Sequence, residues 1–135
     1  MDLKSPISTV VPSLDGPVLE VLARAEGGLS GRQIHKLAGA GSVAGVRLVL
    51  QRLAATGLVH VDDLGNSLLY RLNRKHLVAP IVEQLANLRG MLIARLADEI
   101  GGWRIPPVHA SVYGAIARGD GELDSDVDLL LIRPD

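Results

Sequence analysis

Residues 30–61, SGRQIHKLAGAGSVAGVRLVLQRLAATGLVHV, contain the signals of two helices and a strand. Ser30 followed by Gln33 forms a capping box, in which the two side chains satisfy free backbone amides at the start of a helix. Gly39–Gly41 is typical of a tight turn between helices. The stretch therefore predicts a helix, a tight turn and a second helix that leads into a strand.

The second of these helices is predicted between Ser42, which is suited to cap it, and Gly57, which is suited to end it. Apolar residues recur three and four positions apart, as they do on the buried face of a helix. The expected buried residues are Ile34, Leu37 and Ala38 in the first helix and Val46, Val49, Leu50 and Leu53 in the second, which leaves Arg47, Leu48, Gln51 and Arg52 outward.

A further helix is predicted before this stretch and a hairpin within and after it. Upstream, Pro17 is compatible with the first position of a helix whose apolar residues follow at helical spacing. Downstream, residues 58–62 and 68–72 are typical of two strands around a turn-rich loop. Met1–Leu14 contains two prolines and no periodic pattern, so we expect it to be an extended arm.

Three short helices followed by a hairpin resemble a winged helix-turn-helix, and LAATGLV (53–59) is similar to the end of the recognition helix and the first wing strand in many bacterial regulators. The resemblance covers residues 14–75 and implies binding to double-stranded DNA, with the outer face of the third helix in the major groove. The candidate DNA-binding residues are Arg32, Lys36, Ser42, Arg47, Gln51, Arg52 and Arg71, with Arg74 and Lys75 as further candidates for phosphate contacts.

Charge is distributed unevenly, although the formal net charge is only −1. Residues 1–76 contain nine basic and six acidic residues, whereas residues 77–135 contain five basic and nine acidic residues. The first part therefore suits a polyanion and the second a cation. Two observations oppose DNA binding: such helix faces are commonly just solvated, and Asp62 and Asp63 at the wing would repel phosphate.

Composition excludes several classes of protein. The apolar fraction of 47% is sufficient for a core, which must be aliphatic because the chain has no Phe. The absence of cysteine excludes disulfides, thiolate metal sites and cysteine nucleophiles, and is compatible with a cytoplasmic location. The N-terminus has no signal-peptide pattern, and no apolar run is long enough to predict a membrane span.

Residues 77–100 contain the longest helical pattern, with Leu or Ile at every third or fourth position from Leu77 to Ile100. A single helix of this length would measure about 36 Å, which is longer than one small domain requires. We expect residues 76–101 to link two domains and to form a homodimer with a second copy. The glycines and prolines that follow would mark the start of a final domain over 106–135.

Residues 112–132, VYGAIARGDGELDSDVDLLLI, combine a glycine bend with two acids. Asp126 and Asp128 lie two positions apart on an expected strand, so they share a face with Cα atoms about 6.6 Å apart. Such a pair can bind one hard cation or two Mg²⁺. Gly114 lets the backbone approach a ligand, and a helix beginning near Ala115 would direct amides at phosphate. A solvated acidic loop is the alternative, because three further acids lie nearby.

This pattern resembles that of the minimal nucleotidyltransferases, which share the fold of DNA polymerase beta. The resemblance covers about the last 25 residues and implies that two acids bind Mg²⁺ and catalyse, that the bend holds NTP phosphates, and that a third acid follows on a later strand. Ala115 replaces the family's Ser, and the chain ends at Asp135 before a third acid. The implied residues are Asp126 and Asp128 for metal and catalysis, and Gly114, Ala115, Arg118 and Ser125 for nucleotide.

Two functions follow from an α+β fold made of a winged helix with a hairpin wing, a long linker helix and the first strands of a nucleotidyltransferase-like fold. The first is a DNA-binding transcriptional regulator whose last segment binds nucleotide or is a remnant of an enzyme. The second is a Mg²⁺-dependent transfer of a nucleotidyl group from NTP to a hydroxyl acceptor, with the winged helix selecting the target. We favour the first because the third carboxylate is missing.

Overall fold

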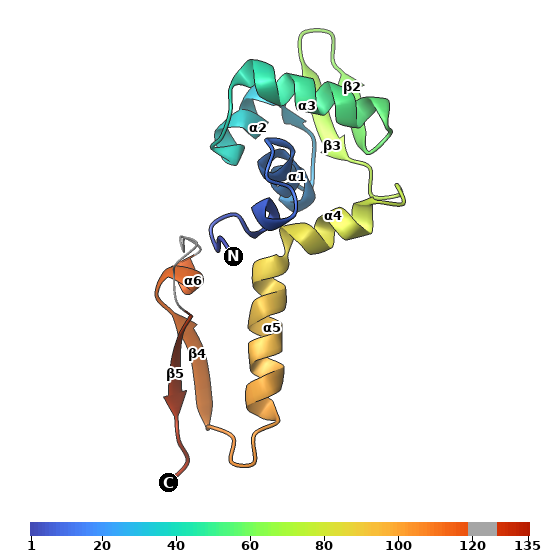
Figure 1. The fold of residues 1–135 in the computed structure, drawn as a ribbon. Helices are drawn as coiled ribbons and strands as arrows, with labels where there is room; N and C mark the ends of the chain where they lie inside the picture. Colours follow the sequence, from blue (N-terminus) through green and yellow to red (C-terminus); the bar gives the residue numbers. More distant parts are fainter. Residues whose placement is uncertain (119–126) are drawn as a thin grey trace. The chain divides into compact units, whose positions relative to one another are not determined.

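The computed structural model describes residues 1–118 and 127–135, which divide into two compact units. Residues 10–86 form the winged-helix unit, and residues 1–9 form the second unit with the described residues from 87 onward. Figure 1 shows the elements of both units in sequence colours. None of the helices in the described part is both long enough and apolar enough to cross a membrane.

The winged-helix unit combines helices with one small antiparallel sheet, whose strand order is β1-β3-β2. The pairs Leu29↔Tyr70 and Val61↔Tyr70 set the register of β3 against its two neighbours. The predicted three helices and hairpin are confirmed, whereas β1 was not predicted because two residues leave no periodic pattern. The elements are α1 (Asp15–Arg24), β1 (Leu29–Ser30), α2 (Gly31–Ala38), α3 (Val43–Ala55), β2 (Val59–Asp63), β3 (Leu68–Leu72) and α4 (Ala79–Ala86).

The predicted caps of α2 and α3 are confirmed. Ser30 Oγ accepts a hydrogen bond from the Gln33 amide at 3.2 Å, and Gln33 Oε1 accepts one from the Ser30 amide at 2.8 Å. Ser42 Oγ accepts from the Gly45 amide at 3.0 Å. Gly39 ends α2 with a φ of +64°, a conformation that residues with a Cβ rarely adopt. Local sequence signals therefore set the limits of both helices.

The core of the unit contains the four residues predicted for the inner face of α3. Ile34 of α2 is fully buried as predicted, but the prediction for Leu37 is wrong, because 64% of its surface is exposed. Leu37 lies beside a cavity between the end of α1 and the end of α2, which leaves its side chain uncovered. The buried side chains of α1, α2 and α3 are Val18, Leu19, Leu22, Ile34, Val46, Val49, Leu50 and Leu53.

The expectation of one helix over residues 77–100 is wrong. The chain instead forms α4 and then α5 (Leu88–Gly101), and Asn87 between them leaves the helical conformation with φ −107° and ψ 23°. Asparagine favours such breaks because its side chain competes with helical hydrogen bonds. α4 packs on α1 and buries Ala79, Val82 and Ala86, whereas Leu77 is 88% exposed. Dimer formation through this region stays a prediction.

The second unit contains a short 3-10 helix, α5 and a hairpin. The expectation of an extended N-terminal arm is wrong for η1 (Pro6–Thr9), which contacts α5 and contains the fully buried Ile7. Strand β4 pairs with β5 in antiparallel register, and Tyr113 lies opposite Asp128. The hairpin elements are β4 (His109–Tyr113), α6 (Ala115–Arg118) and β5 (Asp128–Ile132).

The packing of α3 predicts very different effects for two identical substitutions on one helix. Leu50 is fully buried and Leu48 is 67% exposed. Leu50→Ala should lower the free energy of unfolding by about 2–5 kcal/mol, because it removes core contacts and leaves a cavity. Leu48→Ala should change it by less than about 0.5 kcal/mol. Urea unfolding followed by circular dichroism measures both, and equal effects would contradict the observed rotation of α3.

Candidate functional site

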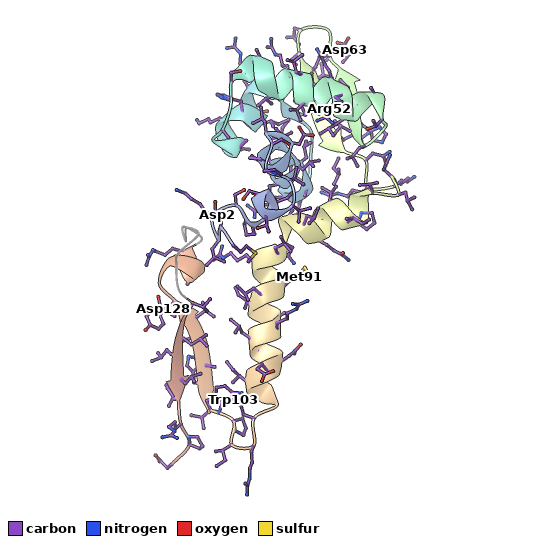
Figure 2. The ribbon with its side chains drawn as sticks, in the orientation of Figure 1. Asp2, Arg52, Asp63, Met91, Trp103 and Asp128 are labelled. Carbon is purple, nitrogen blue, oxygen red and sulfur yellow. The ribbon has the colours of Figure 1, made fainter. Side chains whose placement is uncertain are left out.

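The outer face of α3 has the orientation that the sequence predicts. Arg47, Leu48, Gln51 and Arg52 are all exposed, while the opposite face lies in the core. The side chain of Arg52 is labelled in Figure 2. The helix therefore presents polar and basic side chains to solvent along one side, as a recognition helix would.

Arg47 extends from α3 across the start of α2. A Cβ placed on Gly31 would lie 3.6 Å from Cγ of Arg47 and 3.9 Å from its Nε. Arg32 follows immediately and is exposed, and Lys36 is exposed one turn later. The first amides of a helix lack intrahelical partners and attract anions, so Arg47 adds its charge where α2 already favours a phosphate.

Ser42 lies at the exposed start of α3. Its oxygen accepts the cap hydrogen bond from Gly45 at 3.0 Å. A hydroxyl retains its own proton while it accepts, so Ser42 can still donate to a ligand oxygen. The residue is thus able to cap the helix and contact a phosphate at the same time.

Three of the predicted DNA contacts are engaged in ion pairs within the unit. Arg52 pairs with Asp15 of α1, and Arg71 pairs with Asp62 across the hairpin at 3.3 Å. Arg74 pairs with Glu83 of α4 at 2.7 Å. In the described part of the chain, Arg32, Lys36 and Arg47 make no ion pair. Of these three, Arg32 and Arg47 lie at the start of α2 and Lys36 lies in its last turn, while Lys75, which likewise makes no ion pair with a described residue, follows β3.

Arg74 has a structural role that the sequence did not suggest. Its guanidinium donates to the carbonyl oxygens of Ala23 at 3.1 Å and Ala25 at 2.9 Å, which lie at the end of α1. Cations at this end of a helix interact favourably with its dipole. The partners lie about 50 residues earlier in the chain, so no local pattern indicates the contact.

Two of the four histidines contact backbone carbonyl oxygens through Nε2. His35 Nε2 lies 3.0 Å from the carbonyl oxygen of Gly41. His76 Nε2 lies 3.1 Å from that of Thr56, while the Val78 amide donates to His76 Nδ1 at 3.2 Å. Among the described residues, no three His, Asp or Glu side chains gather closely enough to hold a metal ion.

The glycine bend lies between β4 and α6, as predicted. Gly114 has a φ of +74°, and its carbonyl oxygen accepts from the Arg118 amide at 3.1 Å. A Cβ on Gly114 would lie 2.5 Å from Oδ2 of Asp128, so the acid packs directly over the bend. Asp128 is labelled in Figure 2. Ser125 and Asp126 lie outside the described residues, and Arg118 is exposed at the end of α6.

Comparison with known proteins finds distant structural likenesses only. No protein-family model and no curated protein matches the chain. A structure of human N-acetylserotonin methyltransferase with SAM aligns at 20% identity and a TM-score of 0.42, over 73% of this chain and 30% of that one. A structure of Bordetella bronchiseptica BpsR, a protein whose DNA binding is regulated by 6-hydroxynicotinic acid, aligns at 19% identity and a TM-score of 0.42, over 75% of this chain and 86% of that one.

The contacts of Arg74 predict a loss of stability when it is replaced. Arg74→Ala should lower the free energy of unfolding by about 1–3 kcal/mol, because the carbonyls at the end of α1 lose a charged donor. Lys75→Ala is the matched control, since this neighbouring cation is exposed and should cost less than about 0.5 kcal/mol. Urea unfolding of the two variants measures the difference, and equal stabilities would refute the bracing role.

Proposed function

We propose that the chain is a DNA-binding protein of the transcriptional-regulator class, which places α3 of its winged-helix unit in the major groove of duplex DNA. The observation that carries this proposal is the outer face of α3, where Arg47 and Gln51 are exposed one turn apart. Core packing holds these side chains in solvent, so they can approach base edges and phosphates without rearrangement of the helix.

Phosphate contacts are supported by the arrangement around the start of α2. Arg47 lies over Gly31, and Arg32 and Lys36 follow along the same helix. A DNA phosphate at this point would meet free helix amides and guanidinium groups together. Such contacts hold a protein in register on the duplex but do not distinguish sequences.

Base readout would come from the middle of α3. Gln51 has the donor and acceptor that pair with the major-groove edge of adenine, and Leu48 offers an apolar surface to the methyl group of thymine. Leu48 is 67% exposed, so its side chain is accessible to a base in this proposal. The preference proposed for the core of the site is therefore for A·T pairs.

The wing has a smaller role in this proposal. The pairing of Arg71 with Asp62 at 3.3 Å reduces both the positive charge of the hairpin and the negative charge that would repel phosphate. Asp63 is the last residue of β2, and its Oδ1 accepts from the Gly65 amide at 2.8 Å. The main electrostatic attraction would come from α2 and α3.

A mobility-shift assay on random duplex DNA at about 50 and 200 mM salt tests the proposal. Arg47→Ala should weaken binding to all sequences and reduce the slope of log affinity against log salt by about 1, because one phosphate contact is lost. Arg104→Ala is the control, since it removes an exposed arginine from the second unit. The absence of binding at low salt, or equal losses in the two variants, would refute the proposal.

The juxtaposition of Gly114 and Asp128 favours a second candidate function, binding of a Mg²⁺–nucleotide for nucleotidyl transfer to a hydroxyl acceptor. Asp128 supplies one carboxylate, and Asp126 would supply the next from outside the described residues. A bound Mg²⁺ would neutralise phosphate charge. The chain's own contribution is a bend without a Cβ, which lets the Asp128 carboxylate lie directly against the backbone.

Asp128→Asn should reduce Mg²⁺-dependent binding of a fluorescent ATP analogue by about ten-fold or more, because a charged ligand of the metal is lost. Asp135→Asn removes a charge from the chain terminus, which is exposed, and serves as the control. Fluorescence polarisation with and without EDTA measures both. Binding that is insensitive to EDTA, or unchanged in Asp128→Asn, would remove this acid from nucleotide binding and leave the DNA-binding proposal untouched.

A further inference from the structure

A cavity of about 350 Å³ lies in the second unit, between the loop that follows α5 and the end of β5. Ligand pockets usually measure roughly 300–1,000 Å³, so this space is sufficient for one small organic molecule. Trp103, which lies in the loop and lines the cavity, is labelled in Figure 2. The lining residues are Trp103, Ile105, Pro107, Leu131, Arg133 and Pro134.

The pairing of β4 with β5 brings the two walls together. His109 lies opposite Ile132, and the Val108 amide donates to the carbonyl oxygen of Ile132 at 2.9 Å. This hydrogen bond holds the end of the loop against the end of β5. Leu131 and Arg133 lie two positions apart and both line the cavity, as side chains on one face of an extended chain do. One wall therefore contains an apolar side chain and a cation next to each other.

The walls are mostly apolar, and they are open to solvent. The exposed fraction is 42% for Trp103, 70% for Ile105 and 36% for Leu131. A ligand with an apolar body would cover these side chains and gain the free energy of removing them from water. Pro107 and Pro134 stiffen the walls, because the proline ring fixes φ and leaves less conformational freedom to lose on binding.

Arg133 is the charged residue of the lining. No carboxylate of the described residues lines the cavity, and Arg133 forms no ion pair with any of them. A guanidinium presents its N–H donors in a planar fork that fits the two oxygens of a carboxylate. One guanidinium balances one carboxylate, so a singly charged acid suits this lining.

The acids close to the cavity in sequence do not line it. Asp98 and Glu99 line a different cavity beside Trp103, where Arg95 is also present. Asp135 is exposed two positions after Arg133. Among the groups that line the cavity itself, the charge is therefore that of Arg133, which would attract an anion and repel an ammonium group.

We propose that this cavity binds small organic acids, with the apolar body of the ligand against Trp103, Ile105 and Leu131 and its carboxylate paired with Arg133. The apolar walls provide affinity, and the guanidinium selects the acid over a neutral or cationic molecule of the same shape. The proposal depends neither on DNA binding nor on nucleotide binding. The residues of α3 belong to the other unit, and Asp128 lies four positions before Ile132, about 13 Å along β5.

Trp103 is the one tryptophan of the chain, so its fluorescence reports on the cavity directly. The test is a titration of the full chain, at constant ionic strength, with cyclohexylacetate, 2-cyclohexylethanol and 2-cyclohexylethylamine, which have no aromatic ring to interfere. The acid should shift the emission to shorter wavelength in a saturable manner and bind at least several-fold more tightly than the alcohol. The amine should bind weakest. A response to the acid that does not saturate, or equal affinities for the three probes, would overturn the proposal.

Variants of two lining residues separate selection of the charge from apolar contact. Arg133→Gln should weaken binding of the acid by about five- to ten-fold and leave that of the alcohol unchanged, because a charged hydrogen-bond donor is lost. Ile105→Ala should weaken the acid and the alcohol alike, by about two- to three-fold, because it removes apolar area and no charge. Both residues are exposed, so neither substitution alters the buried part of the unit.

Arg104→Gln is the matched control, since it removes the same charge from an exposed residue next to Trp103 that does not line the cavity. It should change the affinity for cyclohexylacetate by less than about two-fold, because an exposed charge outside the site is screened. Equal losses in Arg104→Gln and Arg133→Gln would mean general attraction of an anion to basic residues, and the proposal would fail. It would also fail if Ile105→Ala bound both probes as the unaltered chain does.

Discussion

Burial of one face of α3 is the constraint on which the winged-helix unit depends. Val46 and Leu50 are completely buried, and the helix contacts α1, α2 and β2. A rotation of α3 by one residue, about 100°, would move these side chains to solvent and bring charged ones into the core. The outward position of Arg47 and Gln51 is therefore a consequence of packing and is already present in the free protein.

The sequence predicts those parts of the fold that local interactions determine. The capping box at Ser30, the cap at Ser42 and the glycine after α2 each act within a few residues, and all are present. The prediction of a single helix over residues 77–100 was wrong, because regularly spaced leucines do not show whether a helix is uninterrupted. The buried face of α4, which packs on α1, contains Ala79, Val82 and Ala86. These smaller side chains permit close approach of the two helices, and they are buried in place of the leucines.

The sequence predicts those features of the candidate sites that depend on the spacing of residues along the chain. Opposite residues in an antiparallel hairpin must meet, so Gly114 and Asp128 lie together once Tyr113 pairs with Asp128. Which basic side chains take part in ion pairs was not predictable. The sequence has seven basic residues between positions 30 and 75 but does not show their partners. Arg52, Arg71 and Arg74 find theirs on α1, β2 and α4.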